Sequence, residues 1–275
     1  EAQFVADEVN HLTDTGDAKA SDVAVFYRTN AQSRVFEEVF IRVGLPYRVV
    51  GGVRFYERKE VKDALAYVRV LVNPLDTVSL RRSVNEPKRG IGDRAQASIE
   101  HLAGREGMSF WEAMQRAEES GDLATRSLSA VQAFTETMSA LMELAASGEP
   151  ADAVLEAALT CSGYLATLEE SKDPQDETRV ENLAELVAVA REFVVQAGTV
   201  SDDQVEVAPD DVGADLTPGS LAAFLEQVSL VADADQVPDE GDGLVTLMTL
   251  HTAKGLEFPV VFLTGLEDGV FPHMR

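Results

Sequence analysis

Segments with the composition of buried β-strands occur only near the two ends of this chain, and a long stretch of helical sequence separates them. Four short apolar runs are of this kind: 23–27, 47–50, 244–249 and 259–263. Apolar residues at helical spacing predict a helix at 1–12, with an apolar face of Phe4, Val5, Val9 and Leu12. A second helix is predicted at 33–43, between the first two runs, with Val35, Phe36, Val39, Phe40 and Val43 on one side. The order of these segments predicts a strand–helix–strand unit with a parallel sheet. The expected fold class is therefore α/β, with a large, mainly helical subdomain inserted into it.

The inserted block has no convincing strand between about residues 53 and 243. Apolar spacing predicts helices there, at 57–72, 76–85, 93–102, 109–119, 123–146, 151–160, 175–197 and 218–232. An acidic stretch with Pro209 and Gly213, residues 200–217, predicts a mobile loop. We expect three parts: 1–50, 51–241 and 242–275. Glycines stand at both crossing points and are the candidate hinge residues: Gly51, Gly52, Gly241 and Gly243.

Charge is distributed unevenly. The 275 residues contain 23 Lys and Arg against 48 Asp and Glu, a formal net charge of −25, which argues against binding nucleic acid through bulk positive charge. Residues 21–100 nevertheless hold 14 basic and 10 acidic residues, and no Lys or Arg lies between Arg191 and Lys254. A polyanion can bind the first region while the acidic remainder faces away. The alternatives are that the acidity serves solubility, a partner surface or a brake on duplex binding.

Several classes of protein and site are disfavoured. One cysteine, Cys161, excludes an intrachain disulfide framework, and we expect it to pack in a helix as a small hydrophobe. The chain has no run of 18 apolar residues, so no membrane span is predicted. It also lacks a phosphate-binding loop and any Cys/His cluster with metal spacing, so no metal site and no complete nucleotide hydrolase are predicted. Both ends look cut from a longer protein.

The first segment with binding chemistry is 27–34, which follows a predicted strand and opens a helix. Ligands of open α/β sheets sit beyond the carboxyl ends of the strands, and helix N-termini favour anions. Arg28, Asn30 and Ser33 can therefore donate to phosphates. The alternative is a simple helix cap, with Ser33 capping and with Arg34 and Glu37 in solvent.

The second segment is a glycine turn flanked by cations. Its residues are Lys88, Arg89, Gly90, Ile91, Gly92, Asp93 and Arg94. The glycines allow close backbone approach, and free amides beside cations suit contacts to a nucleic-acid backbone that do not depend on base sequence. The alternative is a tight turn between two helices.

The third segment, 246–258, runs from one predicted strand toward the next. Thr249, His251 and Thr252 can hydrogen-bond a ligand, and Lys254 is the first cation after the acidic stretch. By themselves these residues indicate a binding loop of unknown ligand.

Together these motifs resemble UvrD/PcrA-type DNA helicases of superfamily one, in order and in approximate spacing. The resemblance rests on 27–34 with Glu37 and Glu38, on 51–64, on 89–94, and on 246–258 with Phe271 and Pro272. It implies a partial second RecA-like motor domain that carries an inserted helical subdomain. The first motor domain, with its phosphate loop, would be missing, so we expect this chain alone to be inactive as an ATPase.

The resemblance also implies roles for residues. Single-stranded DNA would be contacted by Arg28, Asn30, Thr249 and His251. The duplex or junction would be gripped by Lys88, Arg89, Gly90, Ile91, Gly92 and Arg94. Glu257 would lie near the nucleotide ribose, and Gly255 would shape that turn. The hinge glycines would let the helical subdomain swivel and so regulate unwinding.

For the parent protein, the resemblance implies an ATP-dependent 3′–5′ helicase of DNA repair and replication that uses ATP and Mg²⁺. It would act in the bacterial cytoplasm at the nucleoid, with no membrane. Repair proteins or RNA polymerase are the expected partners of the helical subdomain. The alternatives are a regulatory module that binds DNA or protein without a motor, and a helicase-like part of a recombination nuclease complex.

Overall fold

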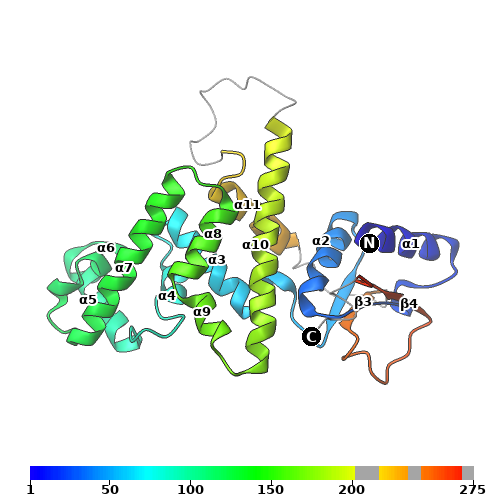
Figure 1. Ribbon diagram of the computed structural model, residues 1–275, viewed down its shortest axis with the longest axis horizontal. Helices are drawn as coiled ribbons and strands as arrows, with labels where there is room; N and C mark the ends of the chain where they lie inside the picture. The colour runs from blue at the N-terminus through cyan, green and yellow to red at the C-terminus, as the bar shows by residue number, and fades with distance from the viewer. Residues whose placement is uncertain (202–216, 235–242, 268–275) are drawn as a thin grey trace. The chain divides into compact units, whose positions relative to one another are not determined.

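The computed structural model describes residues 1–201, 217–234 and 243–267, and it divides the chain into two compact units (Figure 1). The α/β unit comprises Glu1–Arg58 and Val228–Arg275, and the helical unit comprises Lys59–Gln227. The expected fold class, α/β with a helical insertion, is confirmed. The predicted borders at 50/51 and 241/242 stay predictions, and the second lies at residues outside the described ones.

The α/β unit has four strands: β1 (Val23–Tyr27), β2 (Tyr47–Val50), β3 (Val245–Thr249) and β4 (Val260–Leu263). They form one sheet in the order β2-β3-β1-β4, with every neighbouring pair parallel. Two strands from the start of the sequence therefore alternate with two from its end. Short 3₁₀ turns lie at Ala20–Asp22, Asn30–Gln32 and Phe55–Glu57.

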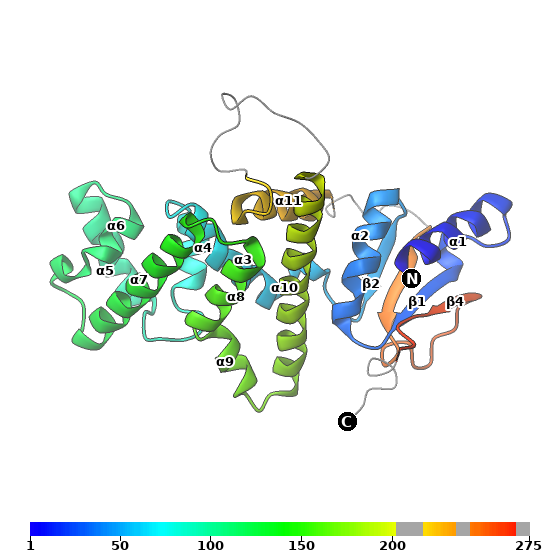
Figure 2. The ribbon, with the colours of Figure 1, turned by 45° about the horizontal axis from the view of Figure 1, so that its top comes forward.

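Helices α1 (Ala2–Thr15) and α2 (Ser33–Val43) pack against each other and against these strands (Figure 2). Their apolar residues share one core with β1 and β3, including Val9, Phe40, Val25 and Leu247. The predicted helical faces are partly wrong, because Phe4 of α1 is 67% exposed and Val35 and Val43 of α2 are also exposed. Burial follows the side of each helix that meets the strands.

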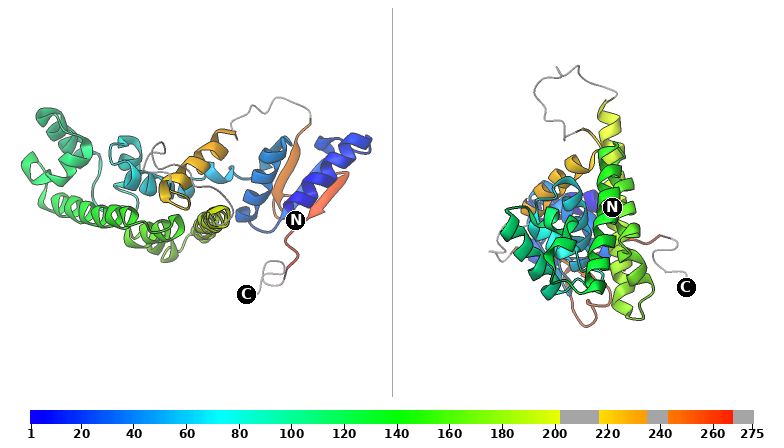
Figure 3. Two further views of the ribbon diagram at one scale, coloured as in Figure 1. Left: turned by 90° about the horizontal axis from the view of Figure 1, so that it is seen from above. Right: turned by 90° about the vertical axis from the view of Figure 1, so that its left-hand side faces the viewer.

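The helical unit is built around α3 (Lys59–Val72), of which ten residues are buried. Around it lie α4 (Thr77–Ser83), α5 (Asp93–Glu106), α6 (Phe110–Gln115), a 3₁₀ turn at Ala117–Ser120, α7 (Thr125–Ala146), α8 (Ala151–Cys161), α9 (Tyr164–Glu169) and α10 (Pro174–Ser201). Helices α7 and α10 run in different directions (Figure 3). Helix α3 is buried on nearly all sides, as a central core element is.

Helix α11 (Leu221–Ala234) begins in the helical unit and crosses its border. Phe224 of α11 contacts Phe193 of α10, with ring centroids 5.7 Å apart. The predicted loop 200–217 lies mostly outside the described residues, but its first two residues still belong to α10. Within the described ranges, no helix is both long enough and apolar enough to cross a bilayer.

The expectation for Cys161 is wrong. This residue ends α8, and it is exposed rather than packed in the core. Cys161 lines a surface pocket together with Phe134 and Met138, so its thiol lies beside apolar side chains but is not covered by them.

Candidate nucleic-acid interface

Parallel pairing brings three loops to one edge of the sheet. Tyr27, the last residue of β1, pairs with Thr249 of β3, and Val50, the last residue of β2, pairs with Met248. The loops that follow these strands therefore leave from the same carboxyl edge, where α/β proteins bind ligands. The backbone N–H of Leu250 donates to the Tyr27 carbonyl at 2.9 Å and fixes the third loop beside the first.

Arg28 and His251 meet at this edge. The Arg28 guanidinium lies 3.2 Å from Nδ1 of His251, although 223 positions separate the two residues in the chain. His251 is exposed and Arg28 is partly exposed. The contact holds a cation at the surface, where it can still reach an anion.

Two backbone N–H groups of the first loop are hydrogen-bonded to a side chain of the same segment. Oε1 of Gln32 accepts the N–H groups of both Arg28 and Thr29, at 2.8 and 3.0 Å. These two amides are therefore not available to a phosphate, and Arg28 can offer a phosphate only its side-chain donors. The sequence pattern did not single out Gln32.

Gly51 permits the second loop to approach the third. Its φ is +78°, and a Cβ built there would lie 2.7 Å from both Cγ2 and Oγ1 of Thr252. Thr252 in turn contacts Thr249 through their hydroxyls, 3.0 Å apart. An added Cβ at Gly52 would lie 3.5 Å from Oδ1 of Asn30. The four residues predicted to bind single-stranded DNA thus lie at this one edge, at the end of a strand or in the segment that follows it, and their roles stay predictions.

The start of α2 carries a buried polar cluster, so the alternative of a solvated helix face is wrong. Ser33, Arg34 and Glu37 are each at most 3% exposed. Ser33 donates to Glu37 at 2.5 Å, and the other Glu37 oxygen accepts the Phe55 N–H at 3.0 Å. Ser33 therefore has a structural partner and is not a free phosphate donor. The cluster also affects the Tyr27 phenol. Burial, followed by the charge of Glu37, raises the pKa of Tyr27.

Arg58 completes this cluster and was missed in the sequence. Its guanidinium donates to the Asn30 carbonyl at 2.9 Å, to the Ser33 hydroxyl at 2.8 Å and to the Val53 carbonyl at 3.1 Å. One buried side chain therefore connects the loop after β1 with the segment after β2. The spacing of Arg58 in the sequence carries no signal of these long-range partners.

Gly255 and Glu257, which are predicted to lie near a nucleotide, stand further along the third loop. Gly255 has a φ of +85°, and Glu257 is exposed. An exposed carboxylate at a glycine turn can accept from ribose hydroxyls. The described residues include no group of three or more His, Cys, Asp or Glu side chains placed to hold a metal ion. Of the predicted hinge residues, Gly241 lies outside the described residues, and Gly243 has open space around an added Cβ.

In the helical unit, the predicted duplex-binding turn has both exposed and buried members. Lys88, Gly90, Gly92 and Arg94 are exposed, whereas Ile91 is fully buried and anchors the turn. Gly90 has a φ of +87°, and Gly92 caps α5.

Arg89 differs from its neighbours because its guanidinium is used inside the protein. It donates to the carbonyls of Ser83 and Val84 at 3.0 and 3.1 Å, to the Tyr67 hydroxyl at 2.9 Å and to the Ser162 carbonyl at 2.8 Å. It also lies over the Phe134 ring, 5.1 Å from the centroid. These contacts join α3, α4, α7 and the end of α8. The exposed cations of the turn are therefore Lys88 and Arg94.

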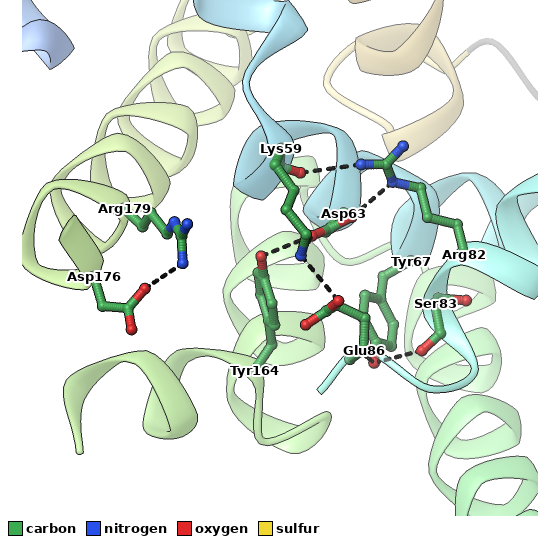
Figure 4. A network of polar contacts seen from close by, with 9 residues as sticks. All are labelled: Lys59, Asp63, Tyr67, Arg82, Ser83, Glu86, Tyr164, Asp176 and Arg179. Carbon is green, nitrogen blue, oxygen red and sulfur yellow. Dashed lines mark hydrogen bonds and ion pairs between the residues drawn. The ribbon is translucent and has the colours of Figure 1, made fainter. Parts of the chain in front are cut away.

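The segment before the turn is held by a polar network centred on Asp63 (Figure 4). The buried Asp63 carboxylate accepts from Lys59 at 2.8 Å, Arg82 at 2.7 Å and Tyr164 at 3.0 Å. Lys59 also binds Glu86 at 2.9 Å. Burial, followed by the Asp63 charge, raises the pKa of Tyr164 well above its ordinary value. The network fixes α3, α4 and α9 around the chain that leads to residue 88.

Comparison with known proteins matches the sequence of this chain to a family of helicase domains. The family described as "UvrD-like helicase C-terminal domain" matches residues 1–275. The chain is 53% identical over 279 residues to the ATP-dependent DNA helicase UvrD1 of Mycobacterium tuberculosis. It is 40% identical over 282 residues to the ATP-dependent DNA helicase PcrA of Bacillus subtilis, and 39% identical over 272 residues to DNA helicase II of Escherichia coli. These alignments cover 99–100% of the chain and 35% of each relative.

Proposed function

This chain belongs to the UvrD-like helicase C-terminal domain family, and from that premise we propose that it forms part of an ATP-dependent 3′–5′ DNA helicase. The chain spans about a third of the length of the relatives that it matches, which are named as DNA helicases. The activity of the whole protein is therefore inferred from them. In that protein ATP and Mg²⁺ supply the driving chemistry, and Glu257 and Gly255 of this chain lie near the nucleotide ribose. The chain alone, without a phosphate loop, lacks ATPase activity.

The carboxyl edge of the sheet binds phosphates of single-stranded DNA in this proposal. The observation that carries it is the meeting of Arg28 with His251 at 3.2 Å, on loops that leave neighbouring parallel strands. Asn30 lies in the segment after β1, and Thr249 is the last residue of β3, just before the loop that carries His251. Contacts to the backbone give affinity without base preference, as a protein that moves along DNA requires.

The helical unit binds the duplex ahead of the single strand, through Lys88, Arg94 and the turn between them. The exposure of both cations and of both glycines supports this assignment. Arg89 and Ile91 act indirectly, because the first clamps the turn and the second anchors it in the core. Swivelling at the glycine-bearing connections would regulate unwinding, and the acidic surface would face away from DNA or toward repair proteins or RNA polymerase.

The experiment measures fluorescence anisotropy of a labelled oligothymidylate with the full 275-residue chain across a salt series. Arg28→Ala is expected to weaken binding by about 5–30-fold, the equivalent of about 1–2 kcal/mol for a lost charged contact. It should also lower the salt slope by about 0.7. Arg42→Ala is the matched control, because Arg42 is exposed at the end of α2. Equal affinity of the two variants would contradict the proposal.

A second arm replaces DNA by a non-hydrolysable ATP analogue. Phosphates of a nucleotide and of DNA present the same chemistry to Arg28. If Arg28→Ala loses the analogue and keeps the oligonucleotide, this edge serves the nucleotide rather than the DNA strand.

A further inference from the structure

In the turn at residues 88–92, every second backbone N–H group is hydrogen-bonded within the protein. Those of Arg89 and Ile91 both donate to Oδ1 of Asn85, at 3.1 and 3.2 Å. Those of Gly90 and Gly92, both exposed residues, have no acceptor in the described parts of the chain. One side-chain oxygen therefore determines which amides are taken and which stay available.

The carbonyl groups of the turn are also held by the helical unit. The Ser127 hydroxyl of α7 donates to the Gly90 carbonyl at 3.2 Å, and the Gln96 amide of α5 donates to the Ile91 carbonyl at 3.2 Å. Polar groups that are bound inside the unit cannot bind a ligand. In the described residues, the backbone amides of the turn that have no acceptor are therefore those of Lys88, Gly90 and Gly92. The two glycine amides lie between the exposed cations Lys88 and Arg94.

We propose that Asn85 is the positioning residue of the duplex-binding turn. By holding the amides of Arg89 and Ile91, it leaves those of Gly90 and Gly92 oriented toward the phosphate oxygens that Lys88 and Arg94 attract. Neutral amides at a fixed spacing recognise the sugar–phosphate backbone without reading bases. This inference rests on the proposed function, because it refines how the same turn binds DNA.

Without Asn85 the turn would populate several conformations. The apparent affinity of a site falls by the fraction of molecules that hold the competent conformation. Asn85→Ala is expected to weaken binding of a single-stranded/duplex junction by about 5–30-fold, as for the loss of about 1–2 kcal/mol. The salt slope should stay unchanged, because no cation is removed. Lys88→Ala should instead lower that slope by about 0.9.

The matched control is Asn73→Ala. Oδ1 of Asn73 also accepts a backbone N–H, that of Leu75 at 3.1 Å, in the same helical unit but at a different loop. It is expected to bind the junction like the unchanged chain. Asn85→Asp keeps an acceptor in place, so the amide resonances of Arg89 and Ile91 should stay near their original positions.

A measurement on the unchanged chain tests the proposal even if the Asn85→Ala variant does not fold. In ¹⁵N-labelled protein, junction DNA should shift the amide resonances of Gly90 and Gly92 more than those of Arg89 and Ile91. Equal shifts, or an Asn85→Ala variant that is folded and binds at full affinity, would overturn the role of Asn85 alone. Failure of the unchanged chain to bind the junction even at low salt would overturn both this role and the duplex-binding assignment.

Discussion

The two candidate DNA-binding surfaces are assembled over very different distances along the chain. At the sheet edge, the Arg28–His251 contact joins residues 223 positions apart. In the helical unit, Asn85 shapes the turn through partners four and six positions away. The first surface exists only after β1 has paired with β3, which follows the inserted helices in the sequence. The second surface is formed by local hydrogen bonds within the helical unit. Damage to long-range packing should therefore abolish the first surface and only displace the second.

The largest expected effect tests whether the turn at 88–94 depends on the helices that the Asp63 network holds together. Asp63→Ala removes a buried carboxylate and leaves Lys59, Arg82 and Tyr164 without their shared acceptor. Asp63 is buried, but Lys59 and Arg82 are 55% and 38% exposed and can regain water, so the loss should cost about 3 kcal/mol, at the low end of the range for a broken buried ion pair. The measurement is urea unfolding followed by the fluorescence of Trp111, which is the one tryptophan of the chain and lies in the helical unit.

The control for Asp63 is Glu156→Ala, on the exposed face of α8. A surface change of this kind should stay within about 0.5 kcal/mol of the unchanged chain. If Asp63→Ala unfolds at the same urea concentration as this control, the network does not support the helical frame.

An intermediate effect tests the long-range surface. Gly51→Ala places a Cβ 2.7 Å from two atoms of Thr252 at a φ of +78°. Gly44→Ala is the matched control, because its φ is +71° and an added Cβ there meets open space. Both variants pay the cost of a left-handed conformation. Overpacking should destabilise Gly51→Ala by about 1–3 kcal/mol more, measured by calorimetry.

The same pair of variants can separate the two surfaces. Gly51→Ala should weaken binding of the oligothymidylate while junction binding through the 88–94 turn is retained. Equal loss of stability in both glycine variants would mean that Thr252 moves aside at no cost and that the close approach is not required.

The smallest effect concerns a helix end in the helical unit. Asp76 caps α4 by accepting from the Ser79 N–H at 3.0 Å and the Ser79 hydroxyl at 2.6 Å. Asp76→Ala should cost about 1 kcal/mol, as lost caps do. Asp76→Asn keeps an acceptor and should lower the free energy of unfolding by only about 0.3 kcal/mol.

The effect of Asp76 depends on pH. Burial acts to raise the pKa of Asp76, but the hydrogen bonds from Ser79 outweigh it and the net pKa is lowered. The charged cap therefore stabilises fully above the unfolded pKa of about 3.9, and this stability is lost as the pH falls through the lower folded value. The difference between Asp76→Ala and the unchanged chain should shrink in acid. A difference that stays constant from pH 7 to pH 3 would show that the carboxylate charge plays no part.

Local pattern was enough to predict much of the fold. The strand positions, most of the helices and the glycine turn at 90–92 follow from apolar periodicity and from glycine, which act over a few residues. The short helix α9 (Tyr164–Glu169) was not predicted, because six residues are too few to show a helical period. The same local reasoning misplaced Phe4 and Cys161, which are exposed. Periodicity marks which side of a helix is apolar, but not which part of it another element covers.

The sequence by itself determined the α/β class, the helical insertion and the segments that carry binding chemistry. Only the tertiary structure decided which polar groups in those segments are free. Packing gave Ser33, Glu37 and Arg89 internal partners and brought Arg28 beside His251. It also placed Arg58 against the loop after β1 and Asn85 against the turn at 88–92. The physical reason is that backbone conformation depends on near neighbours, whereas the partner of a polar side chain depends on what packing brings to it.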